Sequence, residues 1–440
     1  MAGAVAASRS EAACPIAAGL AQGGNRPLPR SAYLHIPFCH RRCFYCDFPV
    51  VPLGDRAGGA PGQTGSRSIE SYLELLCGEI EASPAGPPLS TIYVGGGTPS
   101  MLTAEQLRAV LRSLKRRYGF APGAEISLEL DPASFDRARL QGYLKAGVNR
   151  VSLGGQSFDD VVLERLGRRH RCRDLLEAAA WLQQARAQGE LSSWSLDLIQ
   201  SLPGATAEHW RMQLQQALAL EPPHLSVYDL IVEPGTVFER LESSGELQLP
   251  EEDLSADLME LTAGTLAAAG FGHYEISNYA LPGHASRHNR VYWSGAGWWG
   301  FGLGATSAPW GERHARPRTR EAYGEWLCQQ HRQVDASLER TTAQALPLDD
   351  RLLVGLRRHE GVNLQDQALA SGWSQSWCDR FLPGLEQRWE AALEQGLLLH
   401  EGARWRLTDP EGMALSNQVL VELVCWWETL PADVAGSPSP

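Results

Sequence analysis

The chain has 440 residues, of which 43% are hydrophobic and 20% charged, and its formal net charge is −12. This length predicts two or three domains, or one barrel with additions. The negative charge disfavours broad electrostatic binding of DNA or RNA, and the chain has no apolar run of about 18 residues, which disfavours a membrane span.

The first 30 residues are rich in Ala and Gly and lack an apolar segment followed by a cleavage site, so residues 1–30 are predicted to be a disordered leader. Nine cysteines are present, an odd number, and three of them are clustered. This usage fits a reducing compartment and predicts a cytoplasmic protein rather than a secreted disulfide scaffold. The six scattered cysteines are interpreted as small buried side chains.

Residues 31–235 alternate between short apolar runs and helical patterns, which predicts an α/β fold with parallel strands joined by crossover helices. Six strands make an open, partial (β/α)6 barrel. A closed eight-stranded barrel is less supported, because the alternation fades after about residue 235. The predicted strands are Tyr33–Ile36, Thr91–Val94, Ile126–Leu130, Val151–Leu153, Trp194–Ile199 and His224–Leu230. The predicted helices are 69–82, 104–118, 135–146, 159–187 and 206–219.

The rest of the chain is less regular. A Gly-rich loop is predicted for Gly54–Arg67, a helix for 251–269, and loop with short strand for 273–312. Residues 347–428 predict a mainly helical, winged-helix-like unit with a hairpin at 397–407. The predicted organisation is a leader (1–30), a barrel core (31–235), a barrel extension (236–345), a C-terminal helical domain (346–430) and a tail (431–440).

Three cysteines directly follow the first predicted strand with the spacing Cys39-x3-Cys43-x2-Cys46. A zinc site would normally present a fourth ligand, often as a second Cys-x2-Cys pair, and none follows here. Three thiolates can each hold one iron of a [4Fe–4S] cluster, which leaves the fourth iron open to a small molecule. S-adenosylmethionine can chelate that iron through its amino and carboxylate groups. The pattern therefore indicates a radical S-adenosylmethionine (SAM) site.

Glycines and polar residues stand at the ends of the following strands. Gly95-Gly96-Gly97 ends the second strand and lets the backbone approach a ligand closely. Glu129, Gln156 and Asp197 end or lie in the next three strands, and ligands of parallel α/β folds bind at that edge. Arg168 could pair with a carboxylate of the ligand. Each polar residue alone could equally cap a loop, but their recurrence favours one shared site.

In combination, these segments closely resemble the oxygen-independent coproporphyrinogen III oxidase-like branch of the radical SAM proteins, and within it the heme chaperones. The resemblance covers roughly residues 31–428. The matching segments are His35–Cys39 with Cys43 and Cys46, Tyr93–Ser100, Glu129–Pro132, Gln156–Phe158, Arg165–Arg168, Asp197–Gly204, Tyr274–Ala280, His288–Trp293 and Arg406–Asn417.

The resemblance implies three cofactors, namely a [4Fe–4S] cluster, SAM and heme, and an acceptor hemoprotein as the partner. The implied cluster ligands are Cys39, Cys43 and Cys46. The implied SAM contacts are Tyr33, Tyr45, Gly96, Gly97, Thr98, Glu129, Gln156, Arg168 and Asp197. Thr306 stands where the family often has a histidine, which weakens any heme or substrate role at that position.

Two functions stay open, and a radical enzyme that acts on no tetrapyrrole is a weaker third. The first is a heme chaperone, and the second is an oxygen-independent oxidase that decarboxylates two propionates of coproporphyrinogen III. The oxidases carry a further cysteine shortly after the triplet, whereas this chain reads Cys46-Asp47-Phe48. The segment His288–Trp293 also favours the chaperone, and His288 is the first candidate for the axial heme ligand, with His284 and His273 as alternatives. A homodimer remains open, because aromatic residues around Trp298 could form a contact surface.

Overall fold

The computed structural model describes residues 28–54, 64–309, 313–333 and 346–435. Most of the predicted leader, residues 55–63 of the predicted Gly-rich loop and the end of the tail lie outside these ranges. Residues 64–67, predicted as part of that loop, instead begin the helix α2. None of the described helices is both long and apolar enough to cross a membrane.

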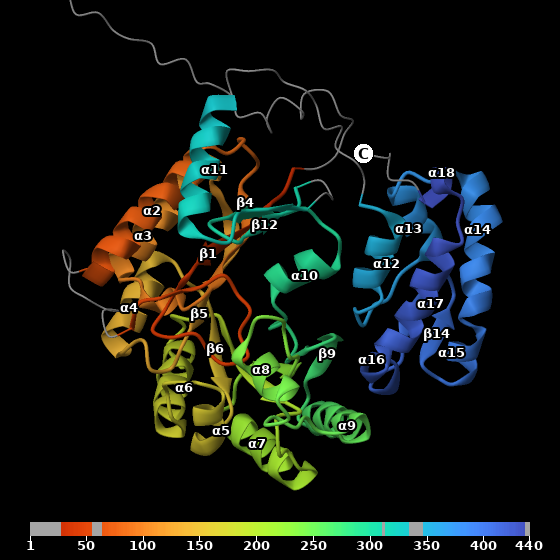
Figure 1. Ribbon diagram of the computed structural model, residues 1–440, viewed down its shortest axis with the longest axis horizontal. Helices are drawn as coiled ribbons and strands as arrows, with labels where there is room; N and C mark the ends of the chain where they lie inside the picture. Colours follow the sequence, from red (N-terminus) through yellow and green to blue (C-terminus); the bar gives the residue numbers. More distant parts are fainter. Residues whose placement is uncertain (1–27, 55–63, 310–312, 334–345, 436–440) are drawn as a thin grey trace, which may run out of the picture.

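Six parallel strands form the centre of one open sheet, which confirms the predicted partial (β/α)6 barrel. They are β1 (Ser31–Ile36), β4 (Leu89–Gly96), β5 (Phe120–Leu130), β6 (Arg150–Gln156), β7 (Ser193–Gln200) and β8 (His224–Asp229). The helices that follow them cover the outer face of the sheet (Figure 1). These are α2 (Thr64–Ala82), α3 (Ala104–Tyr118), α4 (Arg137–Ala146), α5 (Asp160–Arg165), α6 (Cys172–Ala187) and α7 (Ala207–Ala219).

The sheet has nine strands in the order β11-β1-β4-β5-β6-β7-β8-β10-β9, so three short strands extend the six predicted ones. The strand β11 (Trp299–Phe301) pairs in parallel with β1. At the opposite edge, β10 (Asn278–Ala280) and β9 (Gly272–Glu275) pair antiparallel. The two edges do not meet, and the barrel stays open.

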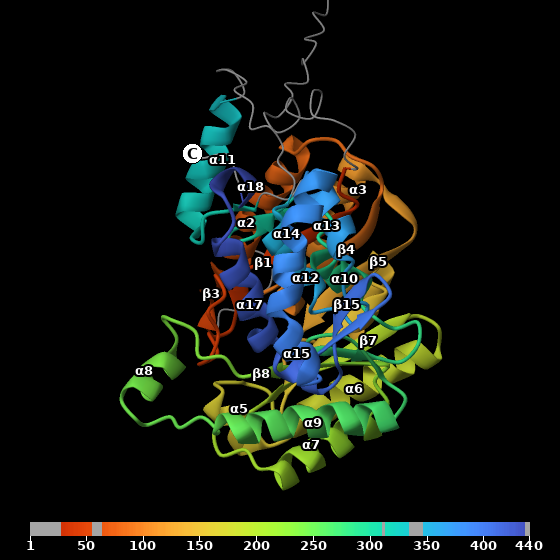
Figure 2. The ribbon, with the colours of Figure 1, turned by 90° about the vertical axis from the view of Figure 1, so that its right-hand side faces the viewer.

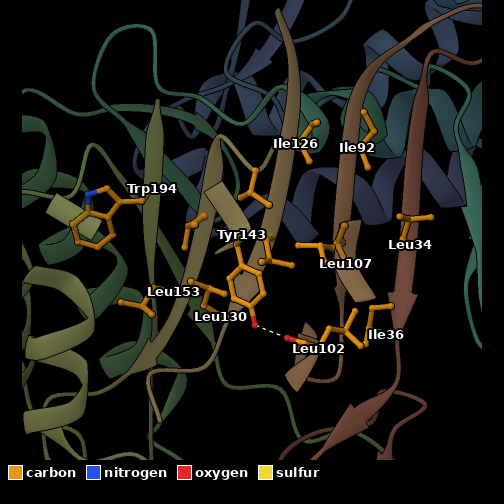
Figure 3. Close-up of a cluster of buried hydrophobic side chains, with 14 of the residues drawn as sticks. Leu34, Ile36, Ile92, Leu102, Leu107, Ile126, Leu130, Tyr143, Leu153 and Trp194 are labelled. Carbon is orange, nitrogen blue, oxygen red and sulfur yellow. Dashed lines mark hydrogen bonds between the residues drawn. The ribbon is translucent and has the colours of Figure 1, made fainter. Parts of the chain in front are cut away.

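Alternation of apolar and polar residues along the strands separates the two faces of the sheet. Leu34, Ile92 and Leu153 point to the outer face and pack against the helices, as Figure 3 shows. There the Tyr143 ring of α4 is fully buried, and its hydroxyl donates to the Leu102 carbonyl oxygen at 2.7 Å. The inner face carries the polar residues, which leaves them free to build a site.

The predicted helix 159–187 is wrong as a single element. It consists of α5 and α6, which are separated at residues 166–171. Gly167 has φ +76°, a left-handed conformation that ends α5, and the side chain of Asp174 accepts from the Arg171 N–H where α6 begins. This break carries Arg168 into the site described below.

The segment 236–345 contains more helix than predicted. Its elements are α8 (Val237–Ser243), α9 (Glu252–Ala268), α10 (Arg287–Trp293), β12 (Thr306–Ser307), β13 (His314–Ala315) and α11 (Arg320–Gln333), in addition to β9, β10 and β11. The prediction of loop and short strand for 273–312 was wrong at α10. Both carboxylate oxygens of Glu125, on β5, accept the first backbone N–H groups of this helix, from Arg287 at 3.1 Å and His288 at 3.0 Å.

The C-terminal helices form a second hydrophobic cluster beside the barrel, most clearly separated in Figure 1. They are α12 (Leu348–Gly355), α13 (Leu364–Ala370), α14 (Gln375–Arg388), α15 (Glu390–Glu394), α16 (Glu411–Ala414), α17 (Ser416–Glu428) and α18 (Ala432–Ala435). The predicted hairpin is confirmed as β14 (Leu398–Glu401) and β15 (Arg404–Leu407). Figure 2 views this unit face-on, in front of the barrel.

Candidate functional site

The three clustered cysteines line one cavity of about 450 Å³ at the carboxyl ends of the parallel strands. Cys39 ends the short strand β2 (Phe38–Cys39), which pairs in parallel with β3 (Val51–Pro52) and so closes the loop that carries Cys43 and Cys46. Arg41 fixes this loop to the break after α5, since its Nε donates to the Gly167 carbonyl oxygen at 2.7 Å.

The arrangement fits a cubane cluster better than a single metal ion. Within the described residues, no group of three or more His, Cys, Asp or Glu side chains lies close enough to hold one ion. A cubane makes no such demand, because each thiolate binds a different iron. Burial raises the pKa of the Cys39 thiol to about 12, and a bound metal would offset this effect by binding the thiolate. The cysteines therefore suit a ligand that brings its own positive charge.

Gly96 and Gly97, called the glycine edge below, lie beside the start of the cysteine loop, since the N–H of Thr98 donates to the Phe38 carbonyl oxygen at 2.7 Å. Gly96 and Gly97 line the cavity, and neither position has room for a side chain. A Cβ on Gly96 would lie 2.6 Å from the His35 ring, and one on Gly97 would lie 2.8 Å from the Phe38 carbonyl oxygen. Protein atoms therefore fill the space that a Cβ would need, which explains glycine at both positions, and the backbone of both residues lines the cavity, as the sequence predicted. Thr98 also lines the cavity, and its hydroxyl lies 3.5 Å from the Cys39 sulfur.

Two carboxylates lie on the cavity wall in low-dielectric surroundings. Glu129 accepts the Gly96 N–H at 3.0 Å, and burial raises its pKa to about 7. Asp197 accepts the Ser152 hydroxyl at 2.7 Å and the Ser195 hydroxyl at 3.3 Å, and burial raises its pKa to about 6. Both groups keep free acceptor capacity towards the cavity. They suit the amino and hydroxyl groups of a ligand.

Arg168 enters the cavity from the break between α5 and α6. Its Nη2 donates to Asp131 Oδ2 at 2.7 Å and to the Gly154 carbonyl oxygen at 2.9 Å, while Nη1 lies 3.7 Å from the Cys43 sulfur. The guanidinium holds the pKa of Asp131 well below its usual range, against the opposing effect of burial. The sequence prediction named Arg168 but missed Asp131 as its partner. A carboxylate two residues after Glu129 was the available signal.

Gln156 has φ +59°, which is strained for a residue other than glycine. Its Oε1 is buried, and no hydrogen-bond partner for it lies in the described part of the chain. The side chain lines the cavity, so a ligand donor could satisfy this oxygen. Tyr45 lines the cavity as well and packs near Phe238.

Two of the predicted residues do not line the cavity. Tyr33 lies behind Tyr93, with ring centroids 6.3 Å apart, and its hydroxyl lies 2.9 Å from His35 Nδ1. His288 is fully buried inside the barrel. Its Nδ1 lies 2.8 Å from the Thr91 hydroxyl and its Nε2 lies 2.9 Å from the Tyr292 hydroxyl. Both ring nitrogens of the predicted heme ligand are therefore occupied in this conformation.

The alternative histidines are also engaged. His284 is half-buried, and its Nδ1 lies 3.0 Å from the Ser193 hydroxyl. His273 stacks on Tyr279, and its Nδ1 lies 2.8 Å from Asp409 Oδ1. Thr306 stands in β12, where its carbonyl oxygen accepts the Trp298 indole N–H at 2.8 Å. None of these three residues lines the cavity.

Comparisons with known proteins agree with this geometry. Residues 33–213 match the family model of the Radical SAM superfamily. The heme chaperone HemW of Synechocystis sp. is 40% identical, over 91% of this chain and 97% of the relative. The heme chaperone HemW of Bacillus subtilis is 34% identical, over 89% and 98%. The structure of the coproporphyrinogen III oxidase HemN from Escherichia coli aligns with a TM-score of 0.70, 23% identity and 90% coverage of both chains, a likeness that shows the fold alone.

Membership of the radical SAM superfamily implies a [4Fe–4S] cluster and SAM. The cavity supplies what both need, namely three cysteine side chains on one loop, a glycine backbone edge and carboxylates on the wall. The two HemW relatives named above exceed 30% identity, and this chain covers 97% and 98% of their lengths. The chain therefore belongs to the HemW family of radical SAM proteins.

Proposed function

We propose that this protein is a heme chaperone, which binds one heme and transfers it to an acceptor hemoprotein. The observation that carries the proposal is the alignment with curated HemW heme chaperones over nearly their whole length. Bovine radical S-adenosyl methionine domain-containing protein 1, which is mitochondrial, is also 31% identical, over 94% of this chain and 93% of that protein.

The cysteine loop supports the chaperone over a decarboxylating oxidase. Asp47 and Phe48 follow Cys46 at the cavity, and no fourth cysteine lines it among the described residues. In the proposed site Cys39, Cys43 and Cys46 hold the cluster, which supplies a coordination site for SAM. At the glycine edge, the N–H of Gly96 already donates to Glu129 and that of Gly97 to the Ile36 carbonyl oxygen, so the carbonyl oxygens of this edge would accept hydrogen bonds from the methionine part of SAM.

The side chains of the wall would hold the remaining polar groups of SAM. Glu129 and Gln156 offer acceptor oxygens to an amino group. Asp197 offers carboxylate oxygens to hydroxyls, held in place by the serines beneath it. Arg168 already pairs with Asp131, but its guanidinium could also reach a ligand carboxylate. Tyr33 would act from behind Tyr93, by supporting the wall rather than by touching the ligand.

His288 stays the proposed axial ligand, and the structure defines what its use requires. Iron would replace the Tyr292 hydroxyl at Nε2, and a porphyrin could reach that nitrogen only if α10 moved out of the barrel. The movement would break the bond to Thr91 and the two bonds from the α10 backbone to Glu125. The Thr91 bond contributes about 1 kcal/mol and each bond to the Glu125 carboxylate about 1.5–3 kcal/mol, so the total of about 4–7 kcal/mol is smaller than the free energy of about 12 kcal/mol that a nanomolar heme complex supplies.

Heme transfer tests this function directly. The anaerobically reconstituted protein is loaded with heme and mixed with the apo form of a b-type hemoprotein, and the absorbance spectra of both are followed. We expect stable heme binding by the full chain, followed by transfer to the acceptor faster than from free heme in buffer. A protein that binds no heme, or that never releases it to an acceptor, would contradict the proposal.

A further inference from the structure

Three arginines gather where α10 meets the C-terminal unit, outside the cavity described above. Arg290 lies on α10, Arg358 follows α12, and Arg404 begins β15. All three contact one residue, Glu360, two of them at its carboxylate and Arg404 at its backbone, and they are called the arginine cluster below. Arg290 forms an ion pair with Glu360, and Arg358 Nε lies 3.4 Å from Glu360 Oε2. Arg404 Nη1 donates to the Glu360 carbonyl oxygen at 3.2 Å and to that of Gly361 at 3.4 Å.

The cluster carries a surplus of positive charge. Glu360 is the one described carboxylate recorded within ion-pair distance of these three guanidiniums, and Arg404 reaches only backbone oxygens. Burial and the charges of Arg290 and Arg404 lower the pKa of Arg358. Three like charges around one acid repel one another, so a second anion would stabilise the group. This surplus stands out in a chain with a net charge of −12.

The guanidiniums are accessible to a ligand. The side chain of Arg290 is 41% exposed and that of Arg358 is 25% exposed, while Arg404 lies on the surface. Trp293, on the last turn of α10, is half-buried and lies three residues after Arg290, so the two side chains leave the same side of the helix. Its side chain bonds to the Glu275 carboxylate, and the backbone of Glu275 pairs with that of Arg358. An aromatic ring near guanidinium groups suits a flat, apolar ligand that carries carboxylates at its edge.

We propose that Arg290, Arg358 and Arg404 bind the two propionate carboxylates of a tetrapyrrole, with its ring edge towards Trp293. This inference rests on the proposed function, since it names the contacts of the heme that the chaperone carries. Guanidinium groups bind carboxylates through paired hydrogen bonds, and two such carboxylates would balance the surplus of two positive charges.

The cluster does not depend on His288 as the iron ligand. Residues 288 and 290 are two positions apart on a helix, about 200° around its axis, so their side chains leave opposite sides of α10. A heme on the arginine cluster would reach His288 only after α10 rotated. The carboxylate contacts and the iron ligand can therefore be tested separately.

The test compares heme with its dimethyl ester, whose propionates are neutral. Both are titrated into the full-length protein and into the variants R404Q and R358Q, with binding followed by the Soret absorbance. Among the described residues, Arg404 donates hydrogen bonds to backbone carbonyl oxygens at the surface, so R404Q should fold like the parent chain, as a thermal unfolding measurement checks. The control is R388Q, since Arg388 pairs with Glu422 between α14 and α17 in the same unit.

We expect heme to bind about tenfold more weakly to R404Q and R358Q, which is the effect of losing a hydrogen bond to a charged group. The dimethyl ester should bind the parent chain and these variants equally, and R388Q should behave like the parent chain. The proposal is overturned if R404Q and R358Q leave heme affinity unchanged, or if they weaken heme and its ester alike. A parent chain that binds neither ligand would overturn the proposed function itself.

Discussion

The substitution Gly96→Ala tests whether the glycine edge must be free of side chains. Gly96 has φ +115°, a conformation that costs an alanine about 1–2 kcal/mol. The added Cβ would also lie 2.6 Å from the His35 ring. That ring cannot yield easily, because its Nδ1 lies 2.9 Å from the Tyr33 hydroxyl and its Nε2 lies 3.0 Å from the Pro49 carbonyl oxygen. Overpacking adds about 1–3 kcal/mol, so the total is about 2–5 kcal/mol.

The matched control is Gly189→Ala. Gly189 also has positive φ, +73°, but an added Cβ there meets nothing within 4 Å, so only the backbone cost of about 1–2 kcal/mol remains. Urea unfolding of the apo proteins measures both losses, and SAM binding to the reconstituted proteins is measured by calorimetry. We expect G96A to be the less stable variant and to bind SAM poorly, while G189A binds it normally. Equal stability and equal SAM binding in both variants would refute the reasoning.

Three further predictions concern the cavity. D131N should lower the free energy of unfolding by about 1–3 kcal/mol at pH 7, because it leaves the half-buried Arg168 without its carboxylate partner. The parent chain should lose this stabilisation as the pH falls below about 4, since the pKa of Asp131 is depressed in the folded state. An unchanged urea midpoint in D131N would contradict this prediction. The pKa of Glu129 is raised to about 7 in the folded state, so the apo chain should lose stability as the pH rises from about 4 to 7. E129Q should lose less stability over this pH range. If the free energy of unfolding falls equally with pH in E129Q and the parent chain, burial does not raise the pKa of Glu129. C39S should abolish the cluster absorbance after reconstitution while C172S, outside the cavity, keeps it, and a surviving spectrum in C39S would disprove the cluster assignment.

Local patterns predicted the barrel and most of the cavity. The strands β1 and β4 to β8 can be predicted because each contains an apolar run. The cysteine spacing and the glycine run are local motifs that can be recognised without knowledge of the fold. The parallel arrangement then brings Glu129, Gln156 and Asp197 to one edge, because each stands near the end of its strand. These residues could be predicted as a group for that reason.

What the sequence could not predict depends on distant contacts. The helix α10 has seven residues in a Gly- and Trp-rich region, and its N-terminus is held by Glu125 from β5. The strand β11 has three residues and exists because β1 offers a free edge. The burial of His288 follows from the position of α10. The segment His288–Trp293 therefore identified the histidine as a candidate heme ligand but did not predict that its ring is buried.

In our proposal, the radical SAM site of this chain serves heme handling rather than decarboxylation. The most direct test offers the anaerobically reconstituted, reduced protein coproporphyrinogen III with SAM, and heme in a parallel sample, and analyses the tetrapyrroles by chromatography. We expect tight heme binding and unchanged coproporphyrinogen III. Formation of protoporphyrinogen IX would contradict it.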